Sequence, residues 1–183
     1  LTIDPARIPF NKAAQYPLPS PAAMLRLRYL HGVSARRARG ALRYNAAGEL
    51  VYPVGAHAVI LDKRTCKQRV VSLHSDEITC MDLSAVHNVC ATGQRGSGDL
   101  SVVVWDASSG QALRSLSIGR VNGASAVCFS PCGNLIAVAC QDINHSVIIF
   151  DWKKDLLVAQ MPTGKDKILS MAFSNVIFAD GVP

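Results

Sequence analysis

A repeated phrase of about 45 residues is the feature that most constrains how this chain can fold. A short apolar run that ends in aspartate occurs three times along the sequence. The three aspartates are Asp62, Asp106 and Asp151, so the copies are 44 and 45 residues apart. A second phrase, which ends in serine, interleaves with the first. Its serines are Ser84, Ser130 and Ser174, which are 46 and 44 residues apart. Two markers with one spacing predict a chain built from copies of a single structural unit.

Each copy has the pattern of short strands joined by turns. Runs of β-branched residues alternate with turn-rich links at 96–99, 108–110 and 131–134. No segment of useful length has the period of a helix. A period of about 40–45 residues with four short strands is typical of a β-propeller blade. The sequence therefore predicts an all-β fold, a β-propeller.

Residues 74–106 carry the clearest WD-repeat signature. The phrase that begins at His74 resembles the His-x-Asp-x-Val opening of a WD repeat, and Trp105 is followed by aspartate. Thr92 and Asp99 stand where such repeats have the Ser/Thr and Asp of a hydrogen-bonded tetrad. We expect His74, Thr92, Asp99 and Trp105 to form that tetrad and to stabilise the blade, because buried polar groups need partners.

The blade count predicts a partial WD-repeat propeller. Residues 74–118 and 119–160 supply about two complete blades, 48–73 supply part of a preceding blade, and 165–183 begin another. Propellers close with about four to eight blades. We therefore expect this chain to be a piece of a longer natural sequence whose other blades complete the ring.

The sequence gives no support to an enzyme. The histidine, threonine and aspartate of the tetrad have blade spacing, and no nucleophile motif accompanies them. The glycines of 93–98 read as a hairpin turn, because neither a helix nor a lysine follows as in a phosphate loop. We expect no catalysis, no cofactor, no metal and no small-molecule substrate. In the next unit Phe150 replaces the tryptophan, so Asp142 and residues 144–145 must hold that turn by other bonds.

The six cysteines are interpreted as reduced, buried thiols of a cytosolic protein. Four of them lie in apolar, strand-like runs, there is no CxxC pair, and the first residues do not have the pattern of a secretory signal. A zinc site is the weaker alternative. No run reaches the roughly eighteen apolar residues that would span a bilayer, so no membrane is expected.

The formal charge of +6 is concentrated near the start of the sequence. Residues 1–43 hold eight basic side chains against one acidic side chain, whereas the other 140 residues hold eleven basic and twelve acidic ones. Such a segment suits an acidic partner, which could be nucleic acid, anionic lipid or the surface of a filament. The alternative is a solvated basic segment without a dedicated partner.

Several phrases go beyond a general WD repeat. Residues 25–32 (LRLRYLHG) precede a basic run and then 48–52 (GELVY), an order that resembles the HELP motif of the echinoderm microtubule-associated protein-like (EML) family. Residues 90–94 (CATGQ) and 150–154 (FDWKK) are similar to further phrases of that family. The resemblance runs from about residue 25 to residue 174. Tyr29 departs from it, since the family usually has tryptophan there, and so does the shortened link at 95–100.

The resemblance implies a non-enzymatic scaffold that binds tubulin. In the EML family the HELP segment packs as part of the propeller core, and the propellers contact microtubules. We expect a location in the cytoplasm, on the cytoskeleton, including ciliary or flagellar axonemes, with no nucleic acid as partner. A basic patch fits the acidic tubulin surface, and the candidate contacts are Arg36, Arg37, Arg39 and Arg43. Their alternative role is to face water on an outer loop. The alternative function is a general WD-repeat adaptor in another multi-protein complex.

The sequence divides into three parts. Residues 1–23, with five prolines, are expected to be an extended segment. Residues 24–73 are predicted to hold the HELP-like segment and the first blade, and 74–183 the WD-repeat blades of an incomplete propeller.

Overall fold

The computed structural model describes residues 27–33, 38 and 40–174. The first sheet has four antiparallel strands in the order β1-β2-β3-β4, joined by short turns. Their bounds are β1 (Arg43–Tyr44), β2 (Leu50–Val54), β3 (His57–Asp62) and β4 (Lys67–Val71). Strands β2–β4 come from residues 48–73, which the sequence predicts to be part of a blade, and the two-residue β1 precedes them.

The second sheet continues along the chain and is also antiparallel. Its strands are β5 (Ile78–Ser84), β6 (Val89–Asp106), β7 (Ala112–Phe129), β8 (Leu135–Cys140), β9 (Val147–Asp151) and β10 (Leu156–Met161). They are hydrogen-bonded in the order β10-β9-β8-β7-β6-β5. The described residues contain no helix, and therefore none that is long and apolar enough to cross a membrane.

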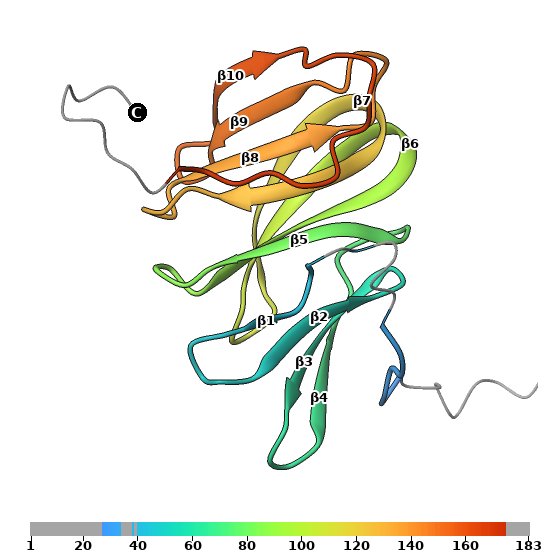
Figure 1. Ribbon diagram of the computed structural model, residues 1–183. Coiled ribbons are helices and arrows are strands. Elements are labelled where there is room, and N and C mark those ends of the chain that lie inside the picture. Colours follow the sequence, from blue (N-terminus) through green and yellow to red (C-terminus); the bar gives the residue numbers. More distant parts are fainter. Residues whose placement is uncertain (1–26, 34–37, 39, 175–183) are drawn as a thin grey trace, which may run out of the picture.

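Each of the two long strands, β6 and β7, supplies two of the strand positions in the second sheet. The second sheet therefore contains two units of four strands. β6 bends back on itself (Figure 1), and the Trp105 indole N–H donates to the Thr92 hydroxyl at 3.1 Å, which joins its two halves. The first part of β7 pairs with β6, and residues 124–129 pair with β8. One unit is thus β5, both halves of β6 and the start of β7. The next is the end of β7 with β8, β9 and β10. The prediction of an all-β, partial propeller is confirmed.

The aspartate that marks each repeat closes the turn that follows its strand. Asp62 accepts a hydrogen bond from the backbone N–H of Arg64 at 2.9 Å. Asp106 accepts from Ser108 and Ser109 at 2.9 and 2.6 Å, and Asp151 from Lys153 and Lys154 at 3.2 and 3.1 Å. An aspartate side chain that binds backbone N–H groups two and three residues later fixes the turn. The period found in the sequence is therefore a period of turns.

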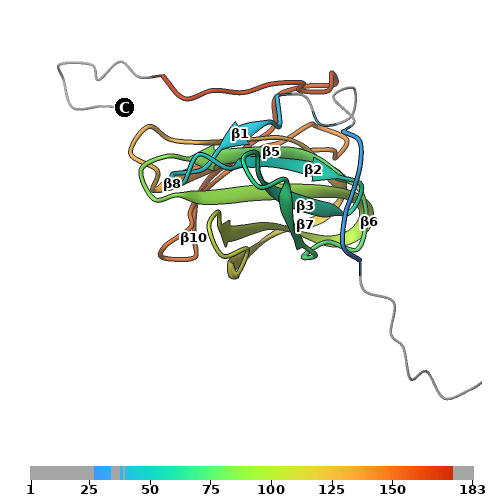
Figure 2. The same cartoon turned by 90° about the horizontal axis from the view of Figure 1, so that it is seen from below.

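The cores lie between successive units. Alternate residues of a strand face opposite sides of a sheet. Val104 accordingly packs in the cluster toward β8 and β9, while its neighbour Trp105 packs in the cluster toward the first sheet. Figure 1 shows the β1–β4 sheet below β5 with the β7–β10 strands above it, and Figure 2 shows the molecule from below, with the first sheet nearest the viewer. Apolar layers between stacked sheets are what propeller blades require.

Beyond β10 the described residues 162–174 contain no strand. Their backbone is nevertheless held, because the N–H groups of Thr163 and Gly164 both donate to the Asn144 carbonyl oxygen at 3.1 Å. The sequence predicts the start of another blade at 165–183, and its last nine residues lie outside the described part of the chain.

Candidate functional site

Three of the four predicted tetrad residues form one continuous chain of hydrogen bonds. Thr92 and Trp105 are fully buried on the two halves of β6, and His74 lies before β5. The Trp105 N–H donates to the Thr92 oxygen at 3.1 Å, and this oxygen is 2.8 Å from His74 Nε2. His74 Nδ1 lies 2.9 Å from the Gln94 side-chain oxygen, which can only accept. Nδ1 therefore carries the proton, and the Thr92 hydroxyl donates to Nε2.

Gln94 is a partner of His74 Nδ1 that the sequence prediction did not include. Its side chain also donates to the Ser75 hydroxyl at 3.2 Å, so it fixes the segment that leads into β5. Gln94 stands two residues after Thr92 on the same strand and hence on the same face, which is the signal that sequence reasoning missed. The Asp99 backbone pairs with Arg120 on β7. The placement of its side chain lies outside the described part of the structure, so its tetrad role stays a prediction.

The chemistry of this cluster is that of a structural element. The Thr92 hydroxyl is buried and already donates to a histidine, and its oxygen already accepts from Trp105. Burial lowers the pKa of His74, and the hydrogen bond to Gln94 opposes that shift only in part. The imidazole is therefore neutral at pH 7, with both nitrogens engaged. Among the described residues, no group of histidine, cysteine and acidic side chains is arranged to hold a metal ion.

In the following unit the turn between β8 and β9 is held without a histidine–tryptophan pair. One Asp142 carboxylate oxygen accepts the Ser146 backbone N–H at 2.7 Å, and the other accepts the Ser146 hydroxyl at 2.7 Å. Phe150 packs in the core where the preceding unit has Trp105. Apolar packing thus replaces the indole hydrogen bond in this copy of the repeat.

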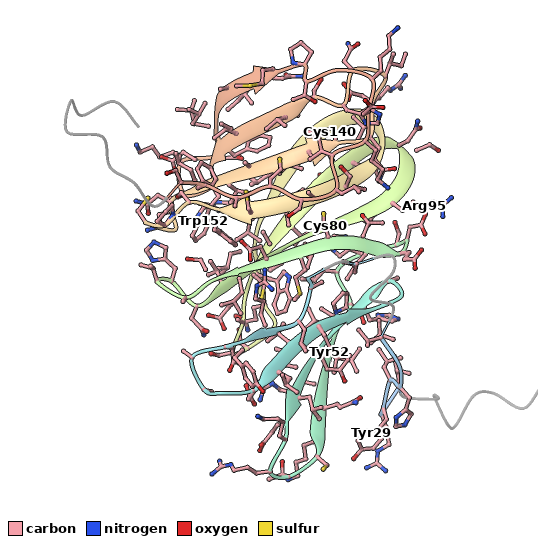
Figure 3. All side chains as sticks on the ribbon, viewed as in Figure 1. Tyr29, Tyr52, Cys80, Arg95, Cys140 and Trp152 are labelled. Carbon is pink, nitrogen blue, oxygen red and sulfur yellow. The ribbon has the colours of Figure 1, made fainter. Side chains whose placement is uncertain are left out.

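The cysteines divide into two classes. Cys80, Cys90, Cys128 and Cys140 are free and buried, and burial raises the pKa of Cys80 to about 12 and those of Cys128 and Cys140 to about 11. Figure 3 shows Cys80 and Cys140 among the strands. The prediction of buried thiols is wrong for Cys66 and Cys132, which are exposed. Both lie in turns, where no neighbouring sheet covers them.

Of the four candidate arginines, only Arg43 lies in the described part of the chain; Arg36, Arg37 and Arg39 fall outside it. Arg43 is on β1, and its Nε and Nη2 atoms are both 3.2 Å from one Asp82 oxygen on β5. The other Asp82 oxygen accepts the Phe129 N–H of β7 at 2.9 Å. Asp82 therefore ties three strands together, and Arg43 has a structural partner. These strands line a cavity of about 230 Å³.

The described residues 27–32 of the predicted HELP-like segment are bonded to the first sheet through the Gln68 side chain. The Leu30 N–H donates to the Gln68 oxygen at 2.8 Å, and the Gln68 amide nitrogen donates to the Leu30 carbonyl oxygen at 3.0 Å. The amide of Gln68 thus bonds both backbone groups of Leu30. Tyr29 stacks on His31 with ring centroids 6.4 Å apart and lies at the outer side of β4 (Figure 3).

Comparison with known proteins agrees with these features. The family model "WD domain, G-beta repeat" matches residues 65–106. The chain is 29% identical over 165 residues to the Ciliary WD repeat-containing protein ctxp80 of Euplotoides octocarinatus, covering 81% of this chain and 23% of that protein. It is 28% identical over 185 residues to Echinoderm microtubule-associated protein-like 2 of Homo sapiens, covering 92% and 28%. The chain thus contains one segment that matches a WD repeat, and most of its length is similar to proteins of the EML family.

The relationship extends beyond the vertebrate proteins of the EML family. The 77 kDa echinoderm microtubule-associated protein of Strongylocentrotus purpuratus is 24% identical over 163 residues, which cover 85% of this chain and 24% of that protein. The chain thus spans about a quarter of the length of these three relatives. The similarity covers 81–92% of the chain, well beyond the single repeat that the WD model matches.

Proposed function

We propose that this chain is part of a microtubule-associated WD-repeat scaffold that binds tubulin in the cytoplasm, on the cytoskeleton and in ciliary or flagellar axonemes. The observation that carries the proposal is the similarity over more than four-fifths of the chain to proteins named as microtubule-associated or ciliary.

The internal bonding of the described residues supports a scaffold without catalysis. His74 and Thr92, whose side chains are of types that catalysts use, are hydrogen-bonded to one another inside a blade. Catalysis needs a group that reaches a reacting atom in a site open to substrate. These groups face the blade interior, so their role is to hold the strands that present an outer surface.

Co-sedimentation of the full-length protein with taxol-stabilised microtubules tests the proposal. We expect the protein to pellet with microtubules at low ionic strength and to be released progressively as salt is raised, because contacts between exposed charges are screened. A protein that stays in the supernatant even at low ionic strength contradicts the tubulin proposal and favours the general WD-repeat adaptor. A tagged copy expressed in a ciliated cell should decorate the axoneme.

A further inference from the structure

We propose that the outer edge of the first sheet is the surface that docks on the acidic partner. This basic rim consists of exposed cationic side chains on the β3–β4 hairpin, on β4 and on the HELP-like segment: Arg28, Lys63, Arg64, Lys67 and Arg69. Its partner is an acidic protein surface. The inference rests on the proposed function and adds to it which face of the molecule makes the contact.

Positive and negative charge lie at different ends of the described structure. Within the described residues, the first sheet and the segment before it (27–33, 38 and 40–73) carry six basic and two acidic side chains, a formal charge of +4. Residues 74–174 carry seven basic and nine acidic ones, a formal charge of −2. One end of the described structure is thus positive and the remainder negative. An acidic partner is steered toward the positive end.

The cations of the basic rim differ in how they are engaged. Lys63 lies over the Tyr44 ring, with its Nζ 4.6 Å from the ring centroid and 3.0 Å from the hydroxyl. Arg69 pairs with Glu49 at 2.6 Å, yet 49% of its side chain remains exposed. The Lys67 ammonium group makes no hydrogen bond or ion pair with another described residue. The rim therefore offers exposed positive charge that the described structure does not neutralise.

The β3–β4 hairpin is also preorganised. Asp62 accepts the Arg64 N–H at 2.9 Å and the Thr65 hydroxyl at 2.8 Å. Its carboxylate is therefore directed into the turn by two hydrogen bonds. A hairpin fixed before binding loses little conformational entropy when a partner docks. Figure 1 shows this hairpin projecting from the end of the molecule, away from β5–β10.

The other two units provide an internal comparison, because each has a hairpin at the same point of the repeat. Residues 106–111 hold one acidic side chain and no cation, for a charge of −1. Residues 151–155 hold two lysines and two aspartates. There Lys154 pairs with Asp151 at 3.2 Å, and Lys153 Nζ lies 3.0 Å from His87 Nε2. Residues 62–67 hold three cations and one aspartate, so only the first hairpin has an excess of positive charge.

Microtubule co-sedimentation of two variants of the full-length protein tests the assignment. The rim variant carries Lys63→Gln, Arg64→Gln and Lys67→Gln, and the control carries Lys153→Gln and Lys154→Gln. Three exposed ion pairs together are worth about tenfold in affinity. We expect the rim variant to bind microtubules about tenfold more weakly, with a flatter salt dependence, and the control to bind within about twofold of the wild type.

Cysteine alkylation provides a readout that does not depend on the variants. Cys66 lies on the β3–β4 hairpin and Cys132 on the β7–β8 turn, and both thiols are exposed. In the wild-type protein, microtubules should slow alkylation of Cys66 and leave that of Cys132 unchanged. Slowing of Cys132 alone would place the contact on the opposite part of the molecule and overturn the assignment.

The outcomes separate this assignment from the proposed function. If the wild type pellets while the rim variant pellets equally well, the surface is wrong and the tubulin proposal stands. If the wild type does not pellet, both are wrong. If the rim variant loses binding to anionic lipid vesicles or to duplex DNA but keeps its microtubule affinity, the rim serves another class of partner and the assignment is overturned.

Discussion

Replacing Thr92 by valine should destabilise the protein strongly although the two side chains have nearly the same shape. The Thr92 hydroxyl is fully buried and accepts from the Trp105 N–H while donating to His74 Nε2. Valine fills the space but offers neither function. The substitution thus strands a donor and an acceptor at once, in the middle of the blade.

The magnitude follows from the burial of the two stranded groups. Trp105 is fully buried, so its unpaired N–H costs about 2 kcal/mol. His74 is half-buried and loses less, about 1 kcal/mol. The expected loss for Thr92→Val is therefore about 3 kcal/mol in the free energy of unfolding. Thr92→Ser keeps the hydroxyl and removes one buried methyl group, so it should cost only about 1 kcal/mol.

Urea unfolding followed by Trp fluorescence and by circular dichroism measures both variants against the wild type. We expect Thr92→Val to lie about 2 kcal/mol below Thr92→Ser. Equal stabilities of the two variants would refute the reasoning, since the hydrogen-bond chain would then contribute nothing beyond the packing of the side chain.

Three further perturbations test other parts of the structure. The pKa of His74 is lowered in the folded protein, so the stability from neutral His74 is present above pH about 6.5 and is lost as pH falls below it. His74→Gln should flatten this fall of the unfolding midpoint with decreasing pH. An unchanged slope of the midpoint against pH would contradict the assigned protonation. Gly133 has a φ of +71°, and a Cβ at this position would meet Ser84 Oγ and lie 2.8 Å from His87 Cδ2. Gly48 has a similar φ of +75°, but a Cβ there would have no atom within 4 Å. Gly133→Ala should therefore lower the thermal midpoint more than Gly48→Ala, and equal shifts would disprove the close contact. Asp82→Ala should lower the free energy of unfolding by about 1–3 kcal/mol, because the Phe129 N–H loses its acceptor. Arg43→Gln should lower it by under about 1 kcal/mol, because the arginine side chain is 41% exposed. Urea titrations that rank the two variants in reverse would contradict the role of Asp82 as the link between the strands.

The sequence was sufficient for the architecture because the repeat has a local cause. Each marker aspartate binds the N–H groups that follow it, so its spacing reports the spacing of turns directly. Alternation along β6 likewise places Trp105 and Val104 in different cores. Features that depend only on neighbours along one strand or one turn can be predicted from the order of residues.

Features that join distant strands could not be predicted in the same way. The pairing of Arg43 with Asp82 spans 39 residues and follows from how two sheets stack. The contact between His74 and Gln94 spans 20 residues and depends on the path of the chain before β5. The basic rim is a partial case: four of its cations come from one run of the sequence, 63–69, and only Arg28 is brought to them by the fold, through the bonds between Leu30 and Gln68.

The most direct test of the central claim is a cryo-electron microscopy map of microtubules decorated with the full-length protein. The structure can be placed in such a map by the positions of its sheets. We predict that the β3–β4 hairpin, with Lys63, Arg64 and Lys67, faces the tubulin surface. A map in which the β7–β10 strands face tubulin and the β3–β4 hairpin points to solvent would contradict the account.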